Sequence, residues 1–108
     1  MNTEMLNIKK IKEHIINRKV DWTKHCLNRL TQRNISIADV KNAINTGKII
    51  EYYYDDYPHP SCLILGYGIN NQILHIVCGV SDDYVHMITA YYPNNELWDE
   101  NKEIRREK

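Results

Sequence analysis

Hydrophobic residues in the first half of the chain recur with the 3.6-residue period of amphipathic helices. The three apolar stripes consist of Leu6, Ile8, Ile11, Ile15 and Ile16, then Cys26, Leu27 and Leu30, then Ile37, Val40, Ala43 and Ile44. Thr23 and Ser36 precede the second and third stripes, and both are residue types that cap helix N-termini. The pattern therefore predicts three helices, over residues 3–18, 24–33 and 37–46.

After Lys48 the period changes, because short β-branched and aromatic runs alternate with turn residues. Four strands are predicted, over residues 49–54, 62–67, 73–80 and 84–92. Their short connections favour an antiparallel meander. The expected fold class is therefore α+β, with N-terminal helices packed on one face of a four-stranded antiparallel sheet. We expect one domain over residues 1–98, followed by a charged tail, residues 99–108, that is a frayed helix or disordered.

Composition and charge narrow the classes of protein that the chain can represent. Lys plus Arg and Asp plus Glu both number 14, so the formal net charge is zero, which excludes a strongly basic nucleic-acid-binding protein of histone or ribosomal type. No apolar run is long enough for a membrane helix, and we expect neither a secretion signal nor contact with a membrane. The three cysteines form no C-x-x-C pair, so we expect free thiols and a cytoplasmic protein.

One charged stripe lies on the second predicted helix. His25, Arg29 and Arg33 are spaced four residues apart, so they share one side of that helix at the rim of its apolar face. An imidazole and two guanidinium groups placed there can bind a phosphate and move a proton. The alternative is a solvated face whose arginine stems cover apolar surface.

His75 lies inside the third predicted strand. It is either a structural histidine or an acid–base group at the open end of the sheet. The spacings His59-x-x-Cys62 and His75-x-x-Cys78 are suggestive of metal ligands, but residues three apart on a strand point to opposite faces. We therefore expect no metal site and no cofactor.

Eight tyrosines in a chain without phenylalanine are a further candidate feature. Their rings suit base stacking or a protein interface, and Tyr54 is a candidate for stacking on a substrate base. The alternative is that tyrosine replaces phenylalanine in the core, with each hydroxyl reaching the rim.

Several short motifs, in order along the chain, resemble the DUF4258 family of small bacterial proteins. They are Trp22-Thr23-Lys24-His25, Arg29, Arg33-Asn34-Ile35-Ser36, Val40, Ala43-Ile44, Gly47-Lys48-Ile49-Ile50-Glu51, Tyr57-Pro58-His59-Pro60-Ser61-Cys62-Leu63, Leu74-His75-Ile76-Val77, and Ile88-Thr89-Ala90-Tyr91 with Pro93 and Trp98. The resemblance spans residues 20–98. This family is similar to RelE- and BrnT-type toxins, which implies a RelE/barnase-like fold and a metal-independent ribonuclease activity.

The resemblance also implies roles for individual residues. His25 and His75 become the general base and the general acid, in an order left open, Arg29 clamps the phosphate, and Tyr91 orients a group or donates a proton. Arg33 assists Arg29, and Lys24, Arg33 and Tyr54 are the expected substrate-binding residues.

The expected function is thus a toxin-like, metal-independent endoribonuclease of a toxin–antitoxin module. Its expected partners are RNA, free or on the ribosome, and a cognate antitoxin protein. The alternative is a non-catalytic protein-binding module, or a homodimer, in which the histidines are structural. The nuclease hypothesis further expects His25 and Arg29 to open onto the same concave wall as His75.

Overall fold

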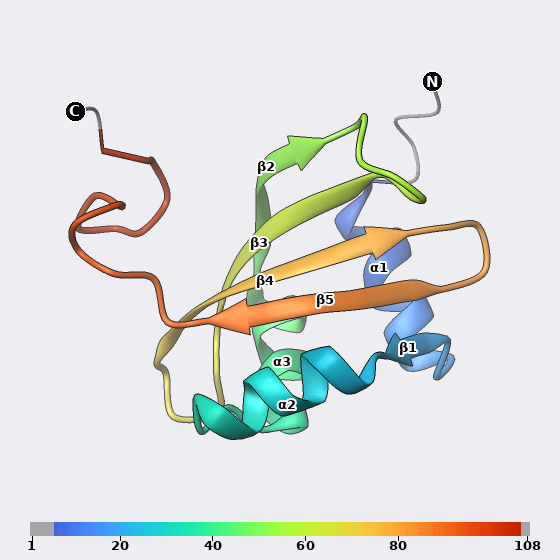
Figure 1. Cartoon of the computed structure of the whole chain (residues 1–108), viewed down its shortest axis with the longest axis horizontal. Helices are drawn as coiled ribbons and strands as arrows, with labels where there is room; N and C mark the ends of the chain where they lie inside the picture. Colours follow the sequence, from blue (N-terminus) through green and yellow to red (C-terminus); the bar gives the residue numbers. More distant parts are fainter. Residues whose placement is uncertain (1–5, 107–108) are drawn as a thin grey trace.

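The computed structural model describes residues 6–106, and its architecture is α+β (Figure 1). The elements in chain order are α1 (Ile8–Ile16), β1 (Val20–Trp22), α2 (Lys24–Gln32), α3 (Ile37–Thr46), β2 (Lys48–Tyr53), β3 (Ser61–Tyr67), β4 (Ile73–Val80) and β5 (Val85–Tyr91). Within the described residues, no helix is long and apolar enough to cross a membrane.

The N-termini of α2 and α3 begin at the residues that the sequence predicts. The Thr23 hydroxyl accepts the backbone N–H of Cys26 at 3.1 Å. Ser36 and Asp39 form a capping box, in which each side chain accepts the backbone N–H of the other residue. These caps satisfy donors that have no partner inside the helix, so the two helix starts are set locally.

The sheet has five strands in the order β1-β5-β4-β3-β2. Strands β2 to β5 form the expected antiparallel meander, but β1 pairs with β5 in parallel, with Val20 opposite Val85 and Trp22 opposite Met87. The prediction of four antiparallel strands was therefore wrong in strand number and incomplete in topology. Three residues are too few to show the alternation by which a strand is recognised in a sequence.

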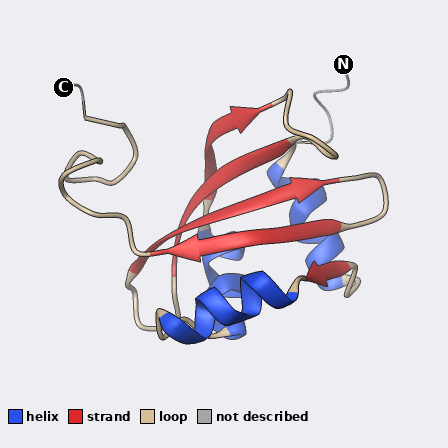
Figure 2. Cartoon of the chain, in the orientation of Figure 1, coloured by secondary structure: helices blue, strands red, loops and turns tan. Residues whose placement is uncertain are grey.

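The helices all cover one face of the sheet, as expected (Figure 2). The main core lies between them and the inward-facing residues of β3, β4 and β5. Helix α3 rests directly on β3, because a Cβ atom added to Gly66 would lie 1.8 Å from the carbonyl oxygen of Ala43. Only glycine permits this close approach of helix and strand.

After β5 the chain turns back, and Trp98 packs against His75 on the face of the sheet opposite to the helices, which we call the outer face. Figure 1 shows this tail beside the strands. Trp98 is only 2% exposed, and it forms an isolated antiparallel bridge with Arg105. The described part of the tail is therefore neither a frayed helix nor a disordered segment. Its partners Lys48 and Glu51 lie about fifty residues earlier in the chain, so no local pattern indicates the contact.

Candidate active site

Ionisable side chains gather on the outer face of the sheet, where the tail covers it. Alternation along the strands places Glu51 and Tyr53 of β2, His75 of β4 and Tyr91 of β5 on this face, and the tail adds Arg105. We call these five residues the outer-face cluster. Four of the five stand on paired strands, which hold their backbones rigidly.

His75 is the most enclosed member of the cluster, with no exposed surface. Its Nε2 lies 2.7 Å from the carbonyl oxygen of Lys102, and its Nδ1 lies 3.3 Å from the hydroxyl of Tyr91. The ring also packs nearly perpendicular to that of Trp98, with centroids 4.4 Å apart. Because a carbonyl oxygen only accepts hydrogen bonds, Nε2 carries the hydrogen and Nδ1 accepts the O–H of Tyr91.

Burial lowers the pKa of His75 below its ordinary value, because the charged imidazolium is poorly solvated there. The hydrogen bond to Lys102 and the negative charge of Glu51 oppose this shift without cancelling it. The imidazole is therefore neutral at pH 7, in agreement with its hydrogen-bond geometry.

Glu51 is the acidic member of the cluster. Its carboxylate accepts two hydrogen bonds from Arg105, 2.8 Å from Nε and 3.0 Å from Nη2, and a third from the hydroxyl of Tyr53. Partial burial acts to raise the pKa of Glu51, but these hydrogen bonds outweigh it and the pKa lies below its ordinary value. Burial and the neighbouring carboxylate raise the pKa of Tyr53 to about 12. Glu51 is thus held in its ionised form.

Arg33 brings a second guanidinium group to the rim of the cluster. From the C-terminal end of α2, its Nη1 donates to the Thr89 hydroxyl at 2.9 Å and to the Ala90 carbonyl at 2.8 Å. Burial raises the pKa of the adjacent Tyr91, and the positive charges of Arg105 and Arg33 oppose that rise. Tyr91 therefore stays protonated, and its hydroxyl donates a hydrogen bond to Nδ1 of His75.

The structure brings together three of the residues expected at the site, His75, Tyr91 and Arg33. It does not bring His25 to them, because His25 is exposed on α2 and lies eight residues, or about 12 Å of helix, before Arg33. The expected concave wall shared by His25 and His75 is therefore not formed, since His75 has no exposed surface.

The other expected residues also lie outside the cluster. Lys24 and Arg29 are exposed on α2, and the Arg29 guanidinium donates to Gln32 on its own helix. Tyr54 follows β2 and stacks on Tyr52, with ring centroids 5.5 Å apart.

Sequence reasoning missed four contributors: Glu51, Tyr53, Trp98 and Arg105. One usable signal existed, since Glu51 is the only carboxylate in β2 and stands between apolar and aromatic residues. Trp98 is among the residues of the family resemblance, which gave it no role. Arg105 lies in the charged tail, which has no periodicity, so the sequence carries no comparable signal for it.

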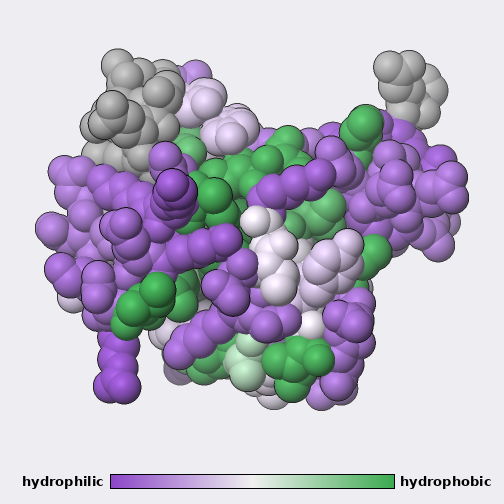
Figure 3. All heavy atoms as spheres, turned by 180° about the vertical axis from the view of Figure 1, so that it is seen from behind, coloured by the Kyte–Doolittle hydropathy of each residue, from purple (hydrophilic) through white to green (hydrophobic). Residues whose placement is uncertain are grey.

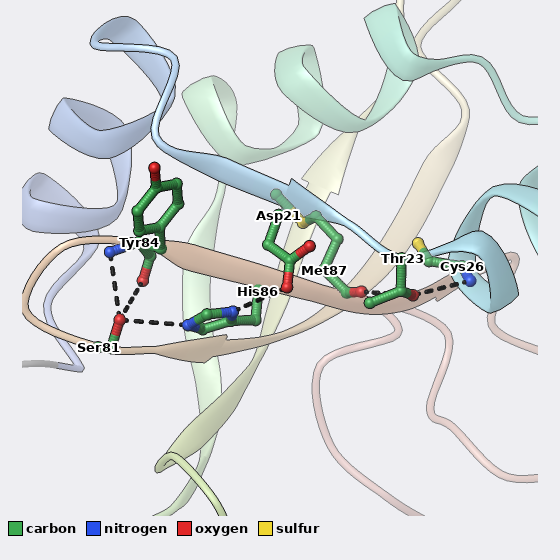
Figure 4. Close-up of polar contacts among 7 residues, drawn as sticks. All are labelled: Asp21, Thr23, Cys26, Ser81, Tyr84, His86 and Met87. Carbon is green, nitrogen blue, oxygen red and sulfur yellow. Dashed lines mark hydrogen bonds and ion pairs between the residues drawn. The ribbon is translucent and has the colours of Figure 1, made fainter.

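A second polar array lies at the other end of the outer face, around the β4–β5 turn (Figure 4). Asp21 of β1 lies 3.1 Å from Nδ1 of His86, whose Nε2 lies 3.2 Å from the Ser81 hydroxyl. This order is that of a Ser-His-Asp triad, but the Ser81 oxygen also accepts the N–H of Tyr84. The carboxylates of residues 82 and 83, next in the turn, would oppose a developing oxyanion. We therefore interpret the array as a structural tie between β1 and the turn.

The described residues contain no evident metal-binding site. Within residues 6–106, no three His, Cys, Asp or Glu side chains are grouped to hold a metal ion. The three cysteines are buried free thiols, and Cys62 faces Cys78 across β3 and β4 with sulfur atoms 3.9 Å apart.

Comparison with known protein families finds one match, over residues 22–92, to a family described as a domain of unknown function, DUF4258. Comparison with curated proteins and with solved structures finds none. The matched region runs from the end of β1 to just after β5 and contains Glu51, His75 and Tyr91, whereas α1 and the tail lie outside it. Because the match covers well over half of its length, the chain belongs to the DUF4258 family.

Proposed function

We propose that this protein is a metal-independent endoribonuclease of the toxin type, with Glu51 as general base and His75 as general acid. One observation supports the proposal above the others: a carboxylate, Glu51, and an imidazole, His75, lie on one face of a rigid sheet, with the Arg33 guanidinium at the rim. Ionisable groups held on a rigid scaffold are typical of catalytic sites.

The chemistry needs only these groups. Glu51 removes the proton of a ribose 2′-hydroxyl, and the 2′-oxygen attacks the adjacent phosphorus. The bond from phosphorus to the 5′-oxygen breaks, and His75, in the fraction of molecules in which it is a protonated imidazolium, gives that oxygen a proton and becomes neutral. Because burial lowers the pKa of His75, the rate is expected to rise as the pH falls toward that pKa. The products are a 2′,3′-cyclic phosphate and a free 5′-hydroxyl. Arg33, at the rim, supplies positive charge to the phosphate as negative charge develops on it.

The residues assigned here differ from those that the sequence suggested. Glu51 takes the place of His25 as the partner of His75, and Arg33 takes the place of Arg29 at the phosphate. Tyr91 orients the His75 ring through its hydrogen bond to Nδ1. Because the net charge of the chain is zero, RNA capture depends on this local positive charge or on the ribosome rather than on the field of the whole protein.

The test is cleavage of RNA, with and without ribosomes, in the presence of a chelator. Glu51→Gln and His75→Gln are each expected to lower the cleavage rate by about 100-fold or more, since a general acid or base contributes on that order. His86→Gln is the matched control, because it removes an imidazole from the same face outside the cluster. A 2′-deoxy substitution at the cleaved position should block the reaction. Equal rates for His75→Gln and wild type would contradict the assignment.

The alternative function, a protein-binding module, is favoured by a different observation. A hollow of about 410 Å³ lies between α1 and α3, with an apolar floor that includes Ile15 and Ile44. Ile16 at its edge is 77% exposed, and Figure 3 shows apolar surface among hydrophilic side chains on the face seen from behind. A cognate antitoxin protein is the partner proposed for this face.

The two functions are separable by experiment. A non-catalytic module binds its partner equally well as wild type and as His75→Gln, and it leaves RNA intact. Ile16→Asp is expected to weaken partner binding while leaving the rate of RNA cleavage unchanged. We propose the cytoplasm as the compartment, because all three cysteines are free thiols.

A further inference from the structure

We propose that residues 94–106 are an autoinhibitory strap, which caps the general acid and the general base of the outer-face cluster at the same time. This inference rests on the proposed nuclease function. It concerns a segment that lies outside the residues matched to the DUF4258 family.

The strap occupies the atoms that the reaction uses. The Lys102 carbonyl accepts the Nε2 hydrogen of His75 and so occupies the nitrogen that, in the protonated imidazolium, would face the leaving oxygen. The Arg105 guanidinium holds both carboxylate oxygens of Glu51, which must accept the 2′-hydroxyl proton. Trp98 lies against the edge of the His75 ring and leaves it with no exposed surface. In this arrangement, substrate reaches neither group.

The strap is organised internally, so it is able to detach as one unit. Arg105 stacks over Trp98, with its guanidinium carbon 4.6 Å from the ring centroid. The Asp99 carboxylate accepts the backbone N–H of Glu103, and the Arg106 Nε donates to the Asn95 carbonyl at 2.6 Å. These contacts do not involve the sheet.

The attachment of the strap to the sheet is incomplete. A hollow of about 350 Å³ separates part of the strap from β2, β3 and β4, and its lining includes Leu65 and Ile73 on the sheet and Glu100 on the strap. The Arg105 side chain is 56% exposed, so its ion pair with Glu51 is screened by solvent and salt. A segment held by one buried aromatic residue and a few polar contacts is suited to reversible release.

The experiment reverses one charge in the full-length chain. Arg105→Glu places a carboxylate against Glu51 and is expected to lift the strap by like-charge repulsion. Arg106→Glu is the matched control, since it makes the same charge change in the same segment but at a side chain that bonds Asn95 instead of Glu51. Both variants, with wild type, are compared for the rate of RNA cleavage and for the rate at which diethyl pyrocarbonate labels His75, located by peptide mapping.

The expected result is that Arg105→Glu labels His75 and cleaves RNA at least about tenfold faster than wild type, and that Arg106→Glu matches wild type. Unchanged labelling of His75 in Arg105→Glu overturns the inference, because the strap has then not lifted. Faster labelling with unchanged or slower cleavage also overturns it, since the strap then covers His75 without inhibiting. If labelling increases and no protein cleaves RNA, the proposed nuclease function has failed, and the autoinhibition fails with it. The role of the strap as a cover for His75 is then upheld on its own.

Discussion

The imidazole of His75 donates its Nε2 hydrogen to the backbone carbonyl of Lys102 at 2.7 Å, across 27 residues of chain. Together with the Tyr91 hydroxyl at Nδ1, this bond satisfies both ring nitrogens of a histidine that has no exposed surface. A buried imidazole without such partners would destabilise the fold, because its polar atoms would lose their hydrogen bonds to water. The Lys102 carbonyl of the tail therefore offsets part of the free-energy cost of burying His75, and it also sets which ring nitrogen carries the hydrogen.

Removing the Tyr91 hydroxyl should disturb this arrangement without disturbing the core. Tyr91→Phe keeps the ring but removes the donor to Nδ1 of His75, so we expect a loss of about 1 kcal/mol of stability and a cleavage rate lower by about tenfold. Imidazole nitrogen chemical shifts report the change at His75 directly. Tyr92→Phe is the control, because its hydroxyl donates to the Asn34 carbonyl, away from the cluster. Equal effects of the two variants would contradict the positioning role of Tyr91.

The buried state of His75 should make stability depend on pH. Burial lowers the pKa of His75 in the folded protein, so the unfolded chain binds a proton more readily there. The free energy of unfolding is therefore expected to be highest above the ordinary histidine pKa of about 6.5, and to fall as the pH drops below it, by at most about 1.4 kcal/mol per pH unit from this site.

Urea unfolding between pH 7.5 and pH 5.5 measures this dependence. His75→Gln lacks the titrating group and should show a smaller loss of stability over the same range. The carboxylates Glu51, Asp39 and Asp99 have lowered pKa values, so their contributions are lost only at more acidic pH. If His75→Gln lost as much stability as wild type over this pH range, burial of His75 would not be the cause of the pH dependence.

A variant of His25 distinguishes the site expected from the sequence, in which His25 pairs with His75, from the proposed site, in which Glu51 pairs with His75. Because its side chain is exposed on α2, away from the cluster, His25→Ala is expected to change stability by less than about 0.5 kcal/mol and the cleavage rate by less than about twofold. A loss of cleavage by orders of magnitude, with the fold intact by circular dichroism, would show that His25 takes part in catalysis. It would contradict the pairing of Glu51 with His75.

The contact between α3 and β3 should be sensitive to a single methyl group. In Gly66→Ala the new Cβ would overlap the Ala43 carbonyl oxygen, so the helix must move and we expect a loss of about 3 kcal/mol of stability. Gly79→Ala on β4 is the control, since the nearest atom to its Cβ lies at 3.7 Å. Thermal unfolding of the two variants gives the comparison, and similar melting temperatures would show that α3 adjusts without cost.

The fold class could be predicted from the sequence because its signals are local. The caps at Thr23 and Ser36, and the short apolar and aromatic runs bounded by turn residues in β2 to β5, each depend on residues within a few positions of one another. Strand β1 was not predicted, because its three residues acquire a strand conformation only by pairing with β5. Of the residues expected at the site, His75, Tyr91 and Arg33 lie close together, whereas His25 and Arg29 are exposed on α2.

By itself, the amino-acid sequence determined the three helices with their apolar faces and the four strands β2 to β5, because those properties follow from patterns within one element. Only the tertiary structure decided that Glu51 and Arg105, more than fifty residues apart, form an ion pair, and that Trp98 closes over His75. Contacts of this kind depend on how strands are ordered in the sheet and on where the chain returns after β5. No short stretch of sequence encodes that return, because the free energy that holds it comes from partners distant in the chain.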